Sequence, residues 1–422
     1  MTTLKRPALS VELSIGASDG WTLNGGALSK LTAGNVLEGT TDQWVDTRCS
    51  CVSATWRRGS VTPTDFYAVT PGHAQVKLWD PDRTLDPANT LGPYYSKLRA
   101  GVPFRLSWTN RTTPDPNLKT PLFTGYVWSL VWEDDYVTIV GVDELTKLAQ
   151  VELTATTAVG AGDTGIQRIQ RLLTQANSTA TLRPRASGTG REMAATTMAG
   201  NALNLIKTAA ASEWGILTVT PDGVLSYGPE WWTIARSSQL SNLNDYPECF
   251  TNATQPGLEY GSIRNQIYGT STAGALTPVT SSDQSSIDLY GLNRWVFDTT
   301  LKNQADLSWW TGVALNLYKA NPAGYPQTIG VNGSYDDGSN PNGDVYLLLN
   351  APGLETIGVA WTISITDLNA SVQVCGRTDY YTPEKGWETT FTTFANPYTY
   401  TTNYFTLNSD PKDRLDYSAV LK

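Results

Sequence analysis

Histidine is nearly missing from this chain, since His73 is the one copy among 422 residues. Catalytic triads and most zinc sites draw on histidine, so its scarcity excludes most metal centres and most imidazole-based catalysis. His73 follows Pro71 and Gly72, and we expect it at the surface or in a turn. The sequence therefore points away from imidazole chemistry.

Cysteine and charge are also scarce. The four cysteines, Cys49, Cys51, Cys249 and Cys375, are too few for a disulfide framework in a chain of this length, and we expect buried free thiols. Charged residues make up 16% of the chain, with a net charge of −9. No basic run stands out, so we do not expect a surface that grips nucleic-acid phosphates.

Long hydrophobic runs are absent as well. No segment reaches the roughly 18 apolar residues of a membrane span. The N-terminal residues lack the apolar core of a signal peptide. We therefore expect synthesis in a cytoplasm and no membrane span.

Glycine, proline and aromatic side chains are plentiful: the chain has 36 Gly, 23 Pro, 15 Trp, 20 Tyr and 8 Phe. With so little charge, this composition favours strands and turns over long helices. The length predicts about two to four domains.

Residues 1–150 have the pattern of strands and turns. Val102–Trp108, Leu122–Trp132 and Tyr136–Val142 are rich in Val, Phe, Tyr and Trp, and we expect them to be neighbouring strands. A polar turn at Glu133–Asp135 predicts a hairpin between the last two. Further strands are expected at Leu9–Ile15, Ala54–Trp56 and Ala74–Trp79.

Residues 151–232 predict a small α/β segment. Apolar residues at helical spacing predict a helix over Ile166–Ala176 with Asp163 as its N-cap. A second helix is expected at about Asn201–Trp214. The turn Pro221-Asp222-Gly223 predicts a hairpin after it, while Leu182–Arg191 is expected to be a flexible loop.

Residues 233–422 return to a β pattern. One helix, at about residues 303–320, interrupts it, and its apolar positions Ala305, Trp309, Val313 and Leu317 recur every four residues. The expected strands are Ile263–Thr270, Ser286–Tyr290, Val345–Leu349, Trp361–Thr366, Ser371–Thr378 and Trp387–Phe394.

Three patterns that suggest chemistry have plainer explanations. G-x-S-x-G at Gly16–Gly20 lacks the following helix that a nucleophile elbow needs. The acidic and amide residues of Asp336–Asp344 miss the spacing of an EF-hand and suit a hairpin tip. Trp231–Trp232 and Trp309–Trp310 suit stacking on sugars, but we expect at least one of each pair in the core, because neighbours face opposite ways.

No catalytic, cofactor-binding or metal-binding residue is assigned from these patterns, and we expect a protein that is not an enzyme. A glycosidase needs only two suitably spaced carboxylates, so with 39 acidic residues the sequence leaves that alternative open.

Several segments together resemble one family. The string LWDPDRTLDPANTLGPYYSKLRAGVPFRLSW from Leu78, followed after a polar insert by PLFTGYVWSLVW up to Trp132, resembles the first domain of hub-type minor tail proteins of long-tailed phages, particularly those of actinobacteria. Ser286–Arg294 (SIDLYGLNR) resembles the S-I-x-x-Y-G-x-R segment of such hubs, with one extra residue. Val374–Trp387 (VCGRTDYYTPEKGW) resembles their terminal strands.

The resemblance implies a fold that is mainly β with an α/β insert. Two tail-tube-like β-barrel domains, at residues 1–150 and 233–422, would flank a small α/β domain at 151–232. The three strands named above would be part of the first barrel. The protein would be a structural virion protein, a homotrimeric hub that closes the tail tube at the distal tail tip.

The partners implied by the resemblance are the distal tail ring protein, the tail tube, the tape-measure protein and the tip fibre or spike. DNA would pass through the hub without being specifically bound. Two alternatives stay open, namely a distal tail ring protein and a receptor- or carbohydrate-binding β protein of the tail tip. The polar loops Asn110–Thr120 and Leu182–Arg191 are expected to contact other subunits or partners.

Overall fold

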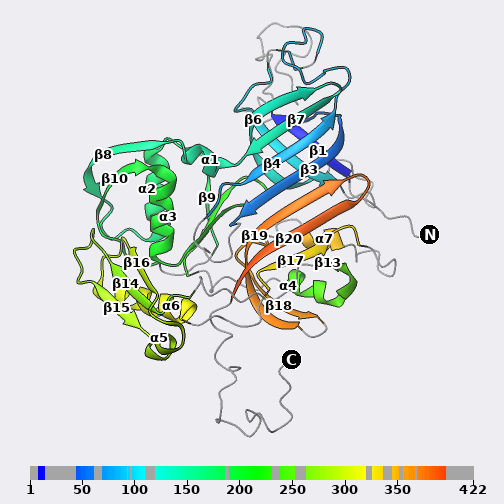
Figure 1. The fold of residues 1–422 in the computed structure, drawn as a ribbon. Helices are drawn as coiled ribbons and strands as arrows, with labels where there is room; N and C mark the ends of the chain where they lie inside the picture. The colour runs from blue at the N-terminus through cyan, green and yellow to red at the C-terminus, as the bar shows by residue number, and fades with distance from the viewer. Residues whose placement is uncertain are drawn as a thin grey trace, which may run out of the picture.

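The computed structural model describes residues 8–14, 44–60, 69–92, 94–95, 97–109, 119–185, 190–230, 238–251, 263–319, 326–335, 345–350, 355–365 and 368–395. Strands predominate in this part of the chain, as the composition predicts (Figure 1). The expected mainly β class is therefore confirmed.

The first seven strands lie at one end of a large sheet: β1 (Ala8–Ser14), β2 (Trp44–Asp46), β3 (Ser50–Gly59), β4 (His73–Trp79), β5 (Pro103–Thr109), β6 (Lys119–Glu133) and β7 (Tyr136–Val142). The three strands expected to be neighbours are neighbours, because β6 pairs antiparallel with both β5 and β7. The hairpin turn between β6 and β7 is also confirmed, with Asp134 in the left-handed region at φ 49°.

Alternating burial explains why these segments are strands with one face in a core. Val137 and Ile139 of β7 are fully buried, while Tyr136, Thr138 and Val140, which alternate with them, are half-buried. After β4, the buried carboxylate of Asp80 accepts hydrogen bonds from the backbone N–H groups of Thr84 (2.8 Å) and Leu85 (2.9 Å). Asp80 thus anchors the start of the segment rich in Asp and Pro that follows β4.

The α/β segment contains α1 (Glu144–Leu148), β8 (Glu152–Val159), α2 (Gly165–Gln175), β9 (Leu182–Pro184), β10 (Thr196–Asn201), α3 (Ala202–Ser212), β11 (Ile216–Val219) and β12 (Leu225–Gly228). Both expected helices and the β11–β12 hairpin are present. The expected cap of α2 is wrong, because Thr164 is the N-cap and forms a capping box with Gln167. Asp163 instead bonds two arginines of α2.

A third small sheet follows the β10-β8 and β11-β12-β9 sheets of the α/β segment; β14 (Gln266–Thr270) lies between β15 (Val279–Ser282) and β16 (Arg294–Asp298), with α5 (Gln284–Tyr290) and α6 (Gln304–Tyr318) beside it. The strand expected at Ser286–Tyr290 is wrong: this stretch is α5. Asp283 caps that helix by accepting from the N–H of Ser286 (3.0 Å), and Gly291 ends it at φ 78°.

The expected helix at about 303–320 is confirmed as α6, but its buried face differs from the expected one. Ala305 is exposed and Trp309 and Val313 are half-buried, while only Leu317 of the expected stripe is buried. The face that packs is Leu307, Trp310, Thr311, Ala314, Leu317 and Tyr318. A stripe that alternates steps of three and four residues follows the helix axis better than steps of four alone.

The last part of the chain returns to the large sheet. It comprises α4 (Ser238–Ser241), η3 (Asn242–Asp245), η4 (Pro247–Cys249), β13 (Phe250–Thr251), β17 (Thr328–Asn332), α7 (Val345–Leu349), β18 (Ala360–Ile365), β19 (Leu368–Thr382) and β20 (Gly386–Ala395). The three late strands expected from the sequence are confirmed. The strand expected at Val345–Leu349 is wrong, because this segment is the helix α7.

One sheet joins the two ends of the chain. Its strand order is β13-β17-β20-β19-β3-β4-β7-β6-β5-β1-β2, with β18 on β19. We call the antiparallel ladder between β3 and β19 the seam; it runs from the pair Gly59 and Gly376 to the pair Ala54 and Tyr381. The order is an open path, so no closed barrel forms among the described strands and the two-barrel expectation is not confirmed.

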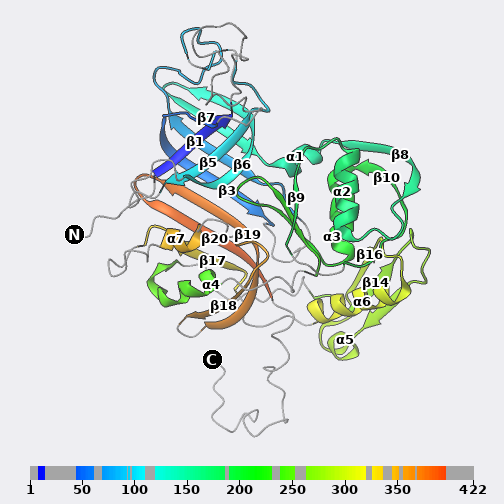
Figure 2. The same cartoon turned by 180° about the vertical axis from the view of Figure 1, so that it is seen from behind.

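The hydrophobic core has three clusters. One fills the first seven strands but also includes Tyr381 and Trp387 from β19 and β20, and the ring of Trp387 meets Trp56 edge-on at 5.3 Å. A second consists of residues of the α/β segment together with Val69, and a third joins Trp214 to α6 and the late strands. Figure 2 shows the helices α2, α3, α5 and α6 on one side of the large sheet.

The expected domain limits at 150 and 232 stay predictions. Two core clusters and the large sheet each contain residues from both sides of such a limit. In the described part of the chain, no helix has the length and apolar character to cross a bilayer. All four cysteines are free; Cys249 and Cys375 are buried as expected, but Cys49 and Cys51 are only half-buried.

Candidate functional site

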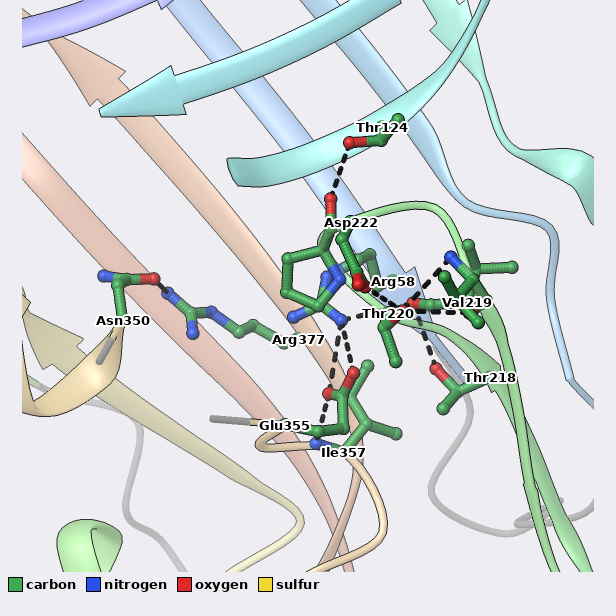
Figure 3. A network of polar contacts seen from close by, with 12 residues as sticks. Arg58, Thr124, Thr218, Val219, Thr220, Asp222, Asn350, Glu355, Ile357 and Arg377 are labelled. Atoms are coloured by element: carbon green, nitrogen blue, oxygen red, sulfur yellow. Dashed lines mark hydrogen bonds and ion pairs between the residues drawn. The ribbon is translucent and has the colours of Figure 1, made fainter. Parts of the chain in front are cut away.

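The most distinctive polar arrangement is a buried junction where the first strands, the α/β segment and the late strands meet (Figure 3). We call it the polar junction and define it by Arg58, Arg185, Val219, Glu355 and Ile357. These residues come from β3, the end of β9, β11 and the turn before β18. They are far apart in sequence, so only the folded chain brings them together.

Arg58 is the centre of the polar junction. Its side chain is 5% exposed, and its Nη1 donates to both carboxylate oxygens of Glu355 (2.9 and 3.2 Å) and to the carbonyl of Val219 (3.2 Å). Glu355 also accepts from the N–H of Ile357 at 2.9 Å. Separating the two partners of a buried pair would leave each charge uncompensated, which is costly. The contacts of Arg58 therefore hold the first strands, the α/β segment and the late strands in one arrangement.

Arg185 adds a second guanidinium beside the first. Its Nη1 donates to the carbonyl of Ile357, and burial lowers the pKa of Arg185, with the nearby charge of Glu355 opposing that effect. Gly358 lies against this group at φ 82°, where a side chain would overlap the guanidinium. The segment Leu182–Arg191, expected to be a flexible loop, begins as the strand β9. Its Arg185 bonds to another part of the same chain.

The α/β segment touches the first strands at a second point. Thr124 of β6 donates through Oγ1 to the carbonyl of Pro221 at 2.8 Å. Gly223, next in the same turn, has φ 85°, and a Cβ there would lie 3.0 Å from the Thr124 methyl carbon. The hairpin turn expected from Asp-Gly is thus also a docking point for β6.

A buried ion pair lies in β19 beside the polar junction. Arg377 donates to Asp379 through Nε (2.8 Å) and Nη2 (2.8 Å), and to Leu349 and Asn350 at 2.8 Å each. Asp379 further accepts from the Trp387 indole (2.9 Å) and the Thr389 hydroxyl (2.6 Å). Both charged side chains are at most 3% exposed. Their hydrogen bonds offset the large desolvation cost of the two charges.

A third set of contacts ties the α/β segment to α6. Arg191 pairs with Glu230 (2.9 Å) and Asp306 (2.5 Å), and its guanidinium carbon lies 3.4 Å from the centroid of the Trp309 ring. Trp310 donates its indole N–H to the carbonyl of Ala211 at 2.9 Å. The other end of the Leu182–Arg191 loop is therefore also engaged inside the chain.

Glu213 lies close to this third set and is fully buried. Burial raises its pKa, while hydrogen bonds from the Tyr227 hydroxyl and the Arg191 N–H favour the carboxylate. Burial, together with the nearby charge of Glu213, raises the pKa of Tyr227 well above its usual value. Both side chains of this pair are closed off from solvent.

The residues singled out from sequence are placed as follows. His73 starts β4 and is half-buried rather than in a turn; burial, helped by the charge of Arg57, lowers its pKa. Trp310 is buried, as expected for one member of its pair, and Trp309 is covered by Arg191. Gly16–Gly20, Trp231–Trp232, Asp336–Asp344 and residues 110–118 lie outside the described residues.

These contacts join segments of the chain that are far apart in sequence. Within the described ranges, no group of three or more His, Cys, Asp or Glu side chains is placed to hold a metal ion. The charged groups described above bond to one another, to backbone groups and to the neutral side chains of Asn350, Trp387, Thr389 and Tyr227. What they do is hold distant segments in register.

The sequence analysis found neither the polar junction nor the buried ion pair beside it. The pair Arg377-x-Asp379 carried a usable signal, because residues two apart in a strand share a face and opposite charges there predict a pair. Arg58 carried no such signal, since its partner Glu355 is 297 residues away.

No family model and no curated protein sequence matches this chain. Solved structures do match. The tail protein from Neisseria meningitidis MC58 has a TM-score of 0.55 at 11% identity, covering 92% of this chain and 96% of its own length. The 43 kDa tail protein of prophage MuSo2 from Shewanella oneidensis has a TM-score of 0.57 at 10% identity, covering 93% and 98%.

These likenesses extend over nearly the whole of both chains, and they include the α/β segment as well as the large sheet. At such low identity they concern architecture alone. The chain therefore has the overall fold of these two tail proteins.

Proposed function

We propose that the protein is a structural component of a phage tail, with no enzymatic role. The observation that carries this proposal is the match in fold to two tail proteins along more than 90% of each chain. The buried charges support it: the Arg58–Glu355 pair joins distant segments, and Arg377, paired with Asp379 in the same strand, also bonds Leu349 and Asn350.

Within the tail, we propose the hub position suggested by the sequence resemblance. The protein would form a homotrimer at the distal tip, contacting the distal tail ring, the tail tube, the tape-measure protein and the tip fibre or spike. Each half of the large sheet would supply one tube-like unit, so three copies would present six. The net charge of −9 suits a passage through which DNA moves without being held.

An exposed apolar face on the first strands favours contact with other proteins. Trp79, Trp128 and Val131 are each 48% exposed on β4 and β6. Large apolar side chains gathered on one exposed face mark interaction sites more often than isolated ones do.

The test is the number of copies and their place. Sedimentation of the full chain should give three times the monomer mass, and imaging of virions with a labelled copy should put the label at the distal tip. Six copies in a ring would favour the distal tail ring protein instead. Tight glycan binding by a monomer would favour the receptor- or carbohydrate-binding alternative.

A further inference from the structure

Five neighbouring strands of the large sheet, β19, β3, β4, β7 and β6, share one outer face that extends across the seam. One row of side chains crosses all five strands, and each member lies beside the next in the ladders: Tyr380, Thr55, Gln75, Val140 and Ser129. The residues before and after Thr55 and Gln75 in their strands are buried. The row itself therefore points away from the core.

Three exposed aromatic side chains border this row. Tyr380, at one end, is 39% exposed, and Trp128, in the bulge of β6 next to Ser129 at the other end, is 48% exposed. Trp79, also 48% exposed, lies on β4 four residues beyond Gln75. The strands of Tyr380 and Trp128 are four spacings apart, which corresponds to about 19 Å at roughly 4.8 Å for each spacing. The three aromatic side chains thus lie at separate points around a floor of shorter side chains.

The floor between the aromatic side chains is polar and has little net charge. Thr55, Gln75 and Thr138 contribute hydroxyl and amide groups to it. Its charged residues Lys77 and Glu133 pair with each other at 3.5 Å. The face therefore offers hydrogen-bonding groups together with separate aromatic surfaces. We call this set the strand platform and define it by Thr55, Gln75, Trp79, Trp128, Thr138 and Tyr380.

The chemistry of the strand platform matches that of an uncharged sugar chain. A sugar ring has an apolar C–H face and a rim of hydroxyl groups, so an aromatic ring can pack on the face while amide and hydroxyl side chains bond to the rim. Apolar contact alone would leave those polar side chains without partners. A neutral sugar is also indifferent to the net charge of −9, which would oppose an acidic partner.

We propose that the strand platform binds an uncharged polysaccharide. The aromatic side chains pack on sugar rings, and Thr55, Gln75 and Thr138 bond to sugar hydroxyls. This binding goes beyond the proposed role in the tail and does not depend on the number of copies. Because Tyr380 and Thr55 are paired across the seam, the strand platform is complete only when both ends of the chain are folded together.

The test is calorimetric titration of the full chain with cellohexaose and chitohexaose, two linear and uncharged oligosaccharides. At least one should bind in the millimolar range. Trp79→Ala and Trp128→Ala should each weaken that binding at least about fivefold, because each removes one stacked ring. Trp128→Phe keeps a ring and should retain most of the affinity. Tyr95→Ala is the control, since Tyr95 is 46% exposed in the segment between β4 and β5, outside the strand platform.

Gln75→Leu distinguishes a sugar from an apolar protein partner. The substitution removes an amide from the strand platform and makes its surface more apolar, so sugar binding should weaken whereas an apolar contact would strengthen. Failure of both oligosaccharides to bind overturns the proposal. Tryptophan-to-alanine variants that bind like the unaltered chain overturn it too, as does a Gln75→Leu variant that binds no more weakly. Circular dichroism of each variant establishes that lost binding is not a lost fold.

The number of copies is measured separately, so the two proposals can fail independently. A trimer that binds the oligosaccharides weakly supports both of them. A trimer that binds neither oligosaccharide overturns the strand platform alone. A monomer that binds through Trp79 and Trp128 overturns the hub and supports the strand platform.

Discussion

At the scale of single residues, three arginines place their charge inside the protein. Arg58, Arg168 and Arg377 are each at most 5% exposed, and each bonds to a carboxylate and to backbone carbonyls. Guanidinium groups suit this task because their donors point in several directions at fixed angles. These arginines connect separate segments of the chain.

Asp379→Ala tests this use of charge. The substitution leaves Arg377 buried without its carboxylate and removes the acceptor for Trp387 and Thr389. We expect a loss of about 3–5 kcal/mol in the free energy of unfolding. Urea unfolding followed by tryptophan fluorescence measures it.

The control is Glu192→Ala, which removes the exposed pair with Lys302, whose two side chains are about half exposed. It should cost no more than about 1 kcal/mol. Equal losses for the two variants would contradict the role given to the buried pair.

At the scale of elements, α2 shows how an acidic residue next to a helix start is used. The Asp163 carboxylate accepts from Arg171 through Nε and Nη2 (2.9 Å each) and from Arg168 at 3.3 Å. The hydrogen bonds from Arg171 lower the pKa of Asp163 below its ordinary 3.8, burial opposes this, and Arg168 lowers it further. The pair of arginines thus fixes the turn before α2 to the helix itself.

Asp163→Asn should therefore have a pH-dependent effect. Because the folded pKa is lowered, the carboxylate stabilises the fold above its ordinary pKa, and this contribution is lost as pH falls through the folded value. We expect the variant to be about 1–2 kcal/mol less stable at pH 7. This difference in the free energy of unfolding between the variant and the unaltered chain, which we call the gap, should shrink when urea unfolding is repeated near pH 2.

Asp134→Asn, in the exposed turn between β6 and β7, is the control and should show no such gap at either pH. A gap for Asp163→Asn that stays constant with pH would show that the amide fails for reasons of shape rather than charge.

Prediction of elements from the sequence succeeded where a local pattern was unambiguous. β6, β7, α2 and α3 have apolar residues at one clear period, and their type was predicted correctly. Ser286–Tyr290 alternates too briefly to separate strand from helix, and its cap, Asp283, decides for the helix. The short run Val345–Leu349 is apolar throughout, so it carried no period at all.

At the scale of the whole molecule, the seam is the feature that no local pattern predicts. Hydrogen bonds between β3 and β19 join residues more than 300 positions apart, and Gly376 lies so close to Ser60 that a side chain would overlap its carbonyl. The polar junction depends on the same long-range closure. The sequence could therefore predict the strands but not the sheet that they share.

The seam predicts that the first strands do not form an independent domain. A fragment of residues 1–150 would expose the edge of β3 and lose Tyr381 and Trp387 from its core. We expect it to aggregate or to melt without cooperativity in near-UV circular dichroism, whereas the full chain melts cooperatively.

Co-expression with residues 233–422 should recover soluble fragment, because the added piece carries β19 and β20. A monomeric 1–150 fragment with a sharp melting transition would overturn this view and support the domain limit expected from the sequence.

The pairing of β3 with β19 also bears on how the protein is made. β3 ends at Gly59 and β19 begins at Leu368. A ribosome needs roughly 15–60 s to synthesise the chain between them. During that time the edge of β3 that later pairs with β19 has no partner strand, while other copies are synthesised nearby. We therefore expect the nascent polypeptide to depend on chaperones more than the finished protein does.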